Sequence, residues 1–183
     1  MGIALICAGA LVVVVLGYVV MVYNRLITMR NRVQNAWAQI DVQLKRRYDL
    51  IPNLVETVKG YTKHEKDTLT EITKLRSQII SGSVEDKAKA NNALSQSLKS
   101  LFAVAENYPQ LRASENFQKL QDELTGTEDK ISYIRTAYND SVYEYNTACD
   151  VFPSSVLAGL FGFKHDVLFE AAAGEREAVK VKF

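Results

Sequence analysis

One feature restricts this sequence more than any other: the 21 residues from Ile3 to Tyr23 carry no charged side chain. A helix of that length spans roughly 32 Å, enough to cross the ~30 Å hydrocarbon core of a bilayer. A cleaved signal peptide would have a basic start, a shorter apolar run and a cleavage site of small residues, and the sequence shows none of these. Residues 1–24 are therefore predicted to form a transmembrane anchor.

Basic side chains near this run predict its orientation. Arg25, Arg30 and Arg32 follow the run, and no basic side chain precedes it. Positively charged residues tend to stay on the cytoplasmic side of a membrane. We therefore expect a single-pass protein with a short N-terminus outside and the rest of the chain in the cytoplasm.

The composition favours long helices and gives no support for nucleic-acid binding. The 22 basic residues nearly balance the 21 acidic ones, so no broad cationic field exists to attract a phosphate backbone. Three prolines and nine glycines are few for 183 residues, which is typical of long helices. Cys7 lies in the apolar run and Cys149 in the polar part, so both are expected to be free thiols.

Beyond the anchor, apolar residues recur at alternating spacings of three and four, which is typical of packed helices. Two capping-box patterns, Thr62 with Glu65 and Ser83 with Asp86, predict helix starts. Pro52 is expected to kink the first helix near residues 47–50 without ending it. The predicted helices are the anchor continued to Gly60, then Thr62 to Gly82, Ser83 to Pro109, and about Ser114 to Pro153.

Short turns between these helices predict an all-α fold, in which the transmembrane helix continues into a long antiparallel up-down four-helix bundle over 25–152. The fourth helix would then return toward the membrane and bring residues 153–183 near its surface. That part contains an apolar stretch too short to span a bilayer: Val156, Leu157, Leu160, Phe161 and Phe163. We expect the stretch either to pack over the base of the bundle as core, or to enter the headgroup region or dock a partner.

The sequence predicts no catalytic, cofactor-binding or metal site, and no small-molecule substrate. Its two histidines, His64 and His165, have no Cys or carboxylate at metal-ligand spacing beyond their immediate neighbours. There is no nucleophile elbow and no glycine loop that would hold a phosphate.

A basic cluster remains as an interaction candidate. Lys45, Arg46 and Arg47 lie beside Asp49. We expect a solvated face whose charges pair with acidic residues of the bundle, and the alternative is a binding site for an acidic partner. Asp41 is expected to form an ion pair inside the bundle.

The tyrosines of the fourth predicted helix do not all share one face. Some of them, with Tyr133 and Tyr143 as candidates, must therefore point outward, where they suit a protein interface. Trp37 lies in the apolar seam and is expected to be core.

Three stretches carry a resemblance to a known family. They are AWAQIDVQLKRRYDLIPNLVETVKGYTKHEK (36–66), YPQLRASENFQKLQDELTGTEDKISYIRTAYNDSVYEYN (108–146) and the FP…LFGF ending (152–163). All three resemble the LemA family of bacterial membrane proteins. The resemblance implies one N-terminal transmembrane helix, a helical bundle, a bacterial inner-membrane location and no known enzymatic activity. A magnetosome-formation protein is similar to the family, which points to membrane organisation. Motif positions, none with a catalytic role, are Trp37, Asp41, Arg46, Arg47, Asp49, Pro52, Asn53, Tyr108, Pro109, Asn116, Phe117, Glu128, Arg135 and Asn139.

These observations predict a membrane-tethered, non-enzymatic scaffold that self-associates or binds another membrane protein. Its contacts would come from the long helices and from residues 153–169, with Pro52 and Asn53 among the candidates. Small residues in the anchor, such as Ala8 and Gly9, allow close approach of a second helix in lipid. The alternatives are an adaptor or accessory of a membrane protease, and a signalling protein in which the Pro52 kink responds to the membrane.

Overall fold

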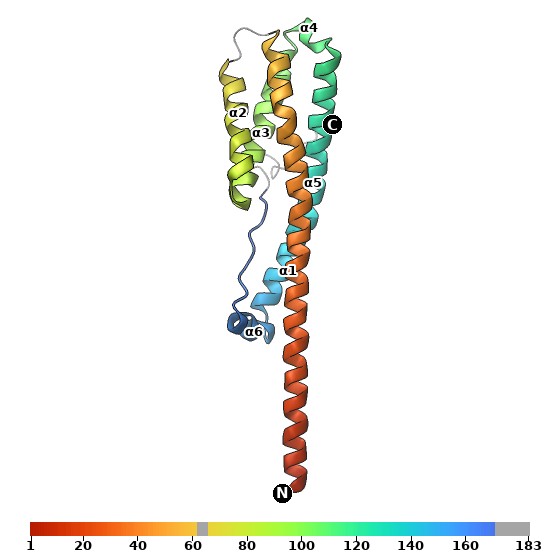
Figure 1. The fold of residues 1–183 in the computed structure, drawn as a ribbon, viewed down its shortest axis with the longest axis vertical. Coiled ribbons are helices and arrows are strands. Elements are labelled where there is room, and N and C mark those ends of the chain that lie inside the picture. The colour runs from red at the N-terminus through yellow and green to blue at the C-terminus, as the bar shows by residue number, and fades with distance from the viewer. Residues whose placement is uncertain (62–65, 171–183) are drawn as a thin grey trace, which may run out of the picture. The chain divides into compact units, whose positions relative to one another are not determined.

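The computed structural model describes residues 1–61 and 66–170 (Figure 1). Every regular element within those ranges is a helix, and the first helix contains the apolar run, so the predicted all-α class and long apolar N-terminal helix are confirmed. The capping box predicted at Thr62 lies outside the described residues. The helices are α1 (Gly2–Lys59), α2 (Lys66–Ser81), α3 (Val84–Ala105), α4 (Pro109–Arg112), α5 (Glu115–Asp150) and α6 (Ser154–Phe161).

The helix ends follow the local sequence closely. The Ser83 hydroxyl accepts a hydrogen bond from the Asp86 amide, and the Asp86 carboxylate accepts one from the Ser83 amide, both at 3.2 Å, so this predicted capping box is confirmed. A Cβ on Gly82 would lie 2.8 Å from the Gln78 carbonyl oxygen, which explains a glycine at this turn. Helix α1 runs through Pro52 without ending, as predicted.

The chain forms two compact units, and the second consists of 38–136 with the chain from Leu168 onward. In it the later part of α1, helices α2 and α3, and the earlier part of α5 lie side by side (Figure 1). The Lys87 ammonium of α3 lies 2.6 Å from the Asp41 carboxylate of α1, which confirms the predicted ion pair of Asp41. The apolar residues that recur at spacings of three and four along α2 and α3 are buried: Leu69, Ile72, Leu75, Ile79, Leu94, Leu98, Leu101 and Ala105. These contacts agree with an up-down four-helix bundle, which as a complete arrangement stays a prediction.

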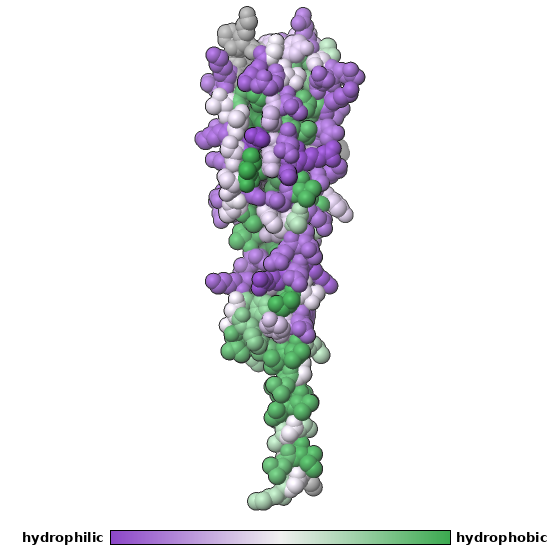
Figure 2. All heavy atoms as spheres, viewed as in Figure 1, coloured by the Kyte–Doolittle hydropathy of each residue, from purple (hydrophilic) through white to green (hydrophobic). Residues whose placement is uncertain are grey.

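The first unit consists of residues 1–37 and 137–167. The start of α1 is covered by no other part of this unit, and its apolar side chains from Leu5 to Tyr18 are exposed (Figure 2). Burial begins at Val22 and continues at Leu26 and Val33, where the end of α5 provides the opposing face. A cis Phe152–Pro153 peptide separates α5 from α6.

Trp37 is half-buried, and its ring packs against the ring of the buried Tyr138 with 5.7 Å between centroids, so its expected place in the core is met in part. The fourth predicted helix was expected to reach Pro153, but α5 ends at Asp150, and Phe152 beyond it is 83% exposed. Helix α6 itself was not predicted.

Candidate functional site

Helix α6 has the sequence SSVLAGLF, which is apolar after its first two serines, and a glycine ends it. Gly162 adopts the left-handed conformation with φ of 71°, and the Phe163 amide donates to the Ala158 carbonyl at 2.9 Å. Such a closure reverses the chain direction after a helix, and glycine enters it without steric cost. The reversal turns Phe163 back toward the same helix that α6 contacts.

That helix is α1, at the point where its apolar run ends. The Phe161 ring meets the Tyr23 ring edge-on with 4.9 Å between centroids, and the Phe163 ring does so at 5.8 Å. Edge-to-face pairs of this kind contribute about 0.5–1.5 kcal/mol beyond the apolar area they bury. Two aromatic side chains from the C-terminal part of the unit are thereby fixed beside the last residue of the apolar run.

The segment after α6 is tied back to α5 by polar contacts. The Asn146 side-chain amide donates to the Asp166 carbonyl and its oxygen accepts from the Asp166 amide, both at 2.9 Å. The Tyr138 hydroxyl donates to the Val167 carbonyl at 2.7 Å. Burial raises the pKa of Tyr138 to about 12, and the charge of Asp166 adds to the rise, so this phenol stays protonated and keeps donating.

Most apolar side chains of this region remain exposed. Phe152, Val156, Leu160 and Phe161 are 83%, 61%, 74% and 47% exposed, and we call these four residues the apolar collar. Leu157 and Phe163 are half-buried. The interpretation of this stretch as core of a bundle base is therefore wrong for Val156, Leu160 and Phe161, which stay exposed. Helix α6 packs through the buried Ala158 and through the contact of the Phe161 ring with Tyr23.

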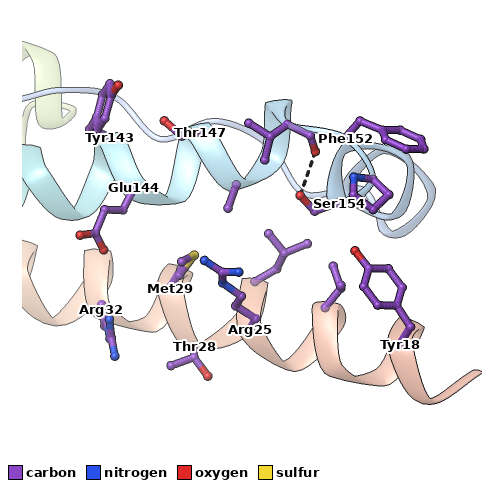
Figure 3. A pocket seen from close by; sticks show the side chains of 15 residues that line it. Tyr18, Arg25, Thr28, Met29, Arg32, Tyr143, Glu144, Thr147, Phe152 and Ser154 are labelled. Atoms are coloured by element: carbon purple, nitrogen blue, oxygen red, sulfur yellow. Dashed lines mark hydrogen bonds between the residues drawn. The ribbon is translucent and has the colours of Figure 1, made fainter. Parts of the chain in front are cut away.

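An open groove of about 860 Å³ lies between α1 and the end of α5, beside α6 (Figure 3). Its walls are largely apolar near the apolar run, where Tyr18, Val22, Val151 and Phe152 contribute. At its other end the lining is polar. The remaining lining residues are Arg25, Leu26, Thr28, Met29, Arg32, Tyr143, Glu144, Thr147, Ala148, Pro153 and Ser154.

The charged side chains of the groove differ in direction. Arg25 points into the space between the helices, Glu144 extends from α5 toward α1, and Arg32 is directed away from α5 (Figure 3). Arg30 of α1 does not line the groove, and its charge acts on Asp166. Burial raises the pKa of the Asp166 carboxyl, and the positive charge of Arg30 opposes that rise.

In the second unit the predicted basic cluster divides into a buried and an exposed part. Arg46 is exposed and lies 2.6 Å from Glu123 of α5, as expected for a solvated face. Arg47 is 2% exposed, so its assignment to that face is wrong. The guanidinium forms an ion pair with Glu128 of α5 and donates to the Asn91 side chain of α3 at 2.5 Å.

The Arg47 network joins three helices. The Ser95 hydroxyl accepts from Arg47 at 3.1 Å and donates to Glu128 at 2.9 Å. Burial lowers the pKa of Arg47 and the nearby charge of Arg135 lowers it further, whereas Glu128 raises it. Losing one partner of this buried ion pair would leave the other charge without compensation. Arg47 thus acts in packing.

The other interaction candidates stay on surfaces. Lys45, Asp49, Pro52 and Asn53 are exposed on α1 in the second unit. Tyr133 and Tyr143 are 81% and 71% exposed, whereas Tyr138 and Tyr145 of the same helix are buried, which confirms that the tyrosines of α5 do not share one face.

Sequence reasoning missed Tyr18, Tyr23, Glu144 and Asn146. The position of Tyr23 could have identified it, because aromatic residues at the end of an apolar run often mark a membrane boundary. No sequence pattern identifies Asn146, since its hydrogen-bond partners are backbone groups 20 positions away. Among the described residues no three His, Cys, Asp or Glu side chains are grouped as a metal site requires.

Comparison with known proteins places these features in a family context. A model of the LemA family matches residues 36–183. Protein LemA of Metamycoplasma hominis is 31% identical over 136 residues, which cover 69% of this chain and 62% of that protein. Magnetosome protein MamQ of Magnetospirillum gryphiswaldense is 24% identical over 181 residues, covering 84% and 66%. Magnetosome protein MamQ 2 of Paramagnetospirillum magneticum is 26% identical over 192 residues, covering 90% and 71%. The chain spans less than two thirds of the length of the first two relatives.

Proposed function

Because this chain belongs to the LemA family, we propose that it is a membrane-anchored helical scaffold that self-associates and organises membrane-protein complexes, and that it is not an enzyme. The observation that carries the proposal is the uncovered apolar surface of the first unit. It comprises the start of α1 and the apolar collar beside Tyr23.

Membrane anchoring accounts for the first part of that surface. Among the described residues, α1 is the one helix long and apolar enough to cross a membrane. Contiguous apolar surface of this size is rare on soluble monomers and is the expected surface of a membrane span. The exposed Arg25, Arg30 and Arg32 support a cytoplasmic position for the residues after the span. The family supports a bacterial inner membrane as its location.

Binding, as opposed to catalysis, is supported by the kinds of side chain that are exposed. The described residues offer exposed tyrosines and apolar side chains, which are typical of interfaces, and hold no cluster of metal-ligating groups. Two of the similar proteins are named magnetosome proteins, which favours a role in organising a membrane.

Self-association can be tested through the cysteines of the chain itself. Cys7 is exposed on the span and Cys149 is buried. In a Cys7→Ser, Cys149→Ser background, a single cysteine would be placed in turn at positions 7, 8, 9 and 10, which together sample every face of one helical turn. Mild oxidation of native membranes should then produce disulfide-linked dimers with one strongly preferred position.

The control is the Cys7→Ser, Cys149→Ser chain, which should remain monomeric on a non-reducing gel. A chain that gives no dimer from any of the four positions does not self-associate through its span. If a photo-crosslinker at Tyr133 or Tyr143 then recovers a membrane protease as the main partner, the adaptor function replaces the scaffold.

A further inference from the structure

Along the groove of the first unit, apolar, cationic and anionic side chains follow one another in the order that would match the acyl chains, phosphate and amine of a phospholipid. Passing along α1 from the apolar run, the groove presents Tyr18 and Val22, then Arg25, then Glu144 (Figure 3). A phospholipid presents acyl chains, then a phosphate, then in many cases a headgroup amine. We propose that this groove binds one aminophospholipid, with its phosphate at Arg25 and its ammonium at Glu144; the inference rests on the proposed membrane anchoring.

The depth of Arg25 suits a lipid phosphate. Tyr23 ends the apolar run, and Arg25 follows it by two residues, which is about 3 Å along the helix axis. The headgroup region begins at this boundary and extends roughly 5–8 Å beyond the hydrocarbon core. A guanidinium at that level meets phosphates with charge-assisted hydrogen bonds, and it does so from inside the groove.

The direction of the side chains selects Arg25 from the three arginines. Arg25 and Arg32 are seven residues apart and share one side of α1, but only Arg25 points between the helices (Figure 3). Arg30 does not line the groove, and its charge acts on Asp166 instead. One guanidinium, that of Arg25, is therefore directed into the groove, whereas Arg32 contributes to its lining with the guanidinium turned away and Arg30 lies outside it.

The apolar wall identifies the ligand as a lipid and not a free anion. A free phosphate would use Arg25 and leave Val22, Val151 and Phe152 unexplained. Phe152 belongs to the apolar collar and is 83% exposed, so the wall continues directly onto surface that the proposed bilayer covers. Basic pockets at the boundary of membrane helices bind lipid headgroups in this way.

Glu144 argues for an amine in the headgroup. Its carboxylate extends toward α1 at the outer end of the groove, beyond Arg25 (Figure 3). A headgroup without positive charge could offer this carboxylate a hydroxyl hydrogen bond but no ion pair. An ethanolamine headgroup, by contrast, carries an ammonium that donates to it.

The test uses the full chain, purified in mild detergent and examined by native mass spectrometry. The probes are phosphatidylethanolamine, phosphatidylglycerol, diacylglycerol and inorganic phosphate. We expect one phosphatidylethanolamine per chain to be retained, a weaker phosphatidylglycerol adduct, and no adduct with diacylglycerol or phosphate. Arg25→Gln should weaken phosphatidylethanolamine retention at least about tenfold, as expected for the loss of a charge-assisted contact.

Matched variants separate the site from the general lipid shell. Arg30→Gln removes a neighbouring charge outside the groove and should leave the adduct unchanged. Thr147→Trp fills the groove without changing its charge and should abolish the adduct. Glu144→Gln should remove the preference for phosphatidylethanolamine over phosphatidylglycerol.

Two results would overturn the inference. One is an adduct that survives both Arg25→Gln and Thr147→Trp, which would indicate unspecific lipid. The other is equal retention of diacylglycerol, which would show that the phosphate is not recognised. Membrane anchoring is checked separately by alkaline extraction of native membranes. A chain that resists extraction but binds no lipid contradicts only the groove, whereas a chain that is extracted contradicts the anchor as well.

Discussion

The ring of Phe161 lies edge-on against the ring of Tyr23, with 4.9 Å between their centroids and 67° between their planes. Tyr23 is the last residue of the uncharged run, and Phe161 is the last residue of α6. The contact fixes the exposed face of a short apolar helix at the end of the proposed span. The apolar collar is therefore expected to lie in the bilayer interface.

The collar can be located with a fluorescent side chain. In a Trp37→Phe background, a tryptophan replacing Leu160 should be quenched strongly by brominated phospholipids. Leu160 is 74% exposed, on the face of α6 that is proposed to contact lipid. Ala137→Trp is the matched control. It is exposed on α5 thirteen positions before the end of that helix at Asp150, roughly 20 Å along the helix, and should not be quenched. Equal quenching of both tryptophans would contradict an interfacial position for α6.

The left-handed residue after α6 should tolerate few substitutions. Gly162→Val forces a β-branched side chain into φ of 71° and should cost about 1–2 kcal/mol, although a Cβ there meets no neighbouring atom. Hydrogen exchange of the 154–167 amides should speed up accordingly. Gly162→Asn should have a smaller effect, since asparagine enters this region more readily. Gly159→Ala, inside α6 with open space around it, should be neutral or slow the exchange.

The two neighbouring arginines of the second unit should differ sharply in their contribution to stability. Arg47→Ala removes one partner of a buried ion pair and should lower the free energy of unfolding by about 3 kcal/mol, the low end for such pairs because Glu128 is 23% exposed. Arg46→Ala breaks an exposed pair and should cost no more than about 1 kcal/mol. Urea unfolding followed by circular dichroism measures both. Equal losses would mean that the Arg47 network adds nothing beyond an ordinary surface pair.

Asp166 makes the stability of the first unit depend on pH. Its folded-state pKa is raised, mainly by burial, so the folded chain binds a proton more tightly there than the unfolded chain does. The favourable contribution of this group is therefore present below the ordinary carboxyl pKa of about 3.9 and is lost as the pH rises through the folded pKa. Asp166→Asn should melt at a higher temperature than the wild type at pH 7, and the difference should shrink on acidification toward pH 4. A lower melting temperature for the variant at pH 7 would show that attraction by Arg30 outweighs burial.

Helix positions were largely predictable because their signals are local. Ser83 and Asp86 are three residues apart, and their hydrogen bonds need only one turn of chain. Pro52 fits inside α1 because a proline costs one hydrogen bond and a modest clash, which packing on both sides can offset. Spacing of three and four likewise identified the buried side of α2 and α3.

The site was less predictable because its contacts join residues far apart in sequence. Because Arg47 lies in a run of basic residues, the sequence predicts that it is exposed. Its burial depends on contacts with Asn91, 44 positions away, and with Glu128. An isolated helix of eight residues is unstable in water, so α6 depends on its contact with Tyr23 and not on its own propensity. Glycine at 162 was visible in the sequence, but the direction in which it turns the chain was not.

The hydrogen bonds between Asn146 and Asp166, 20 positions apart, close the intervening chain into a ring that contains α6. An apolar helix on an open tail would lose conformational freedom each time it entered a bilayer. In a closed ring most of that freedom is already lost when the chain folds. If α6 contacts the bilayer as proposed, little conformational entropy remains to be lost at that step, because the helix is already held in place by the folded chain.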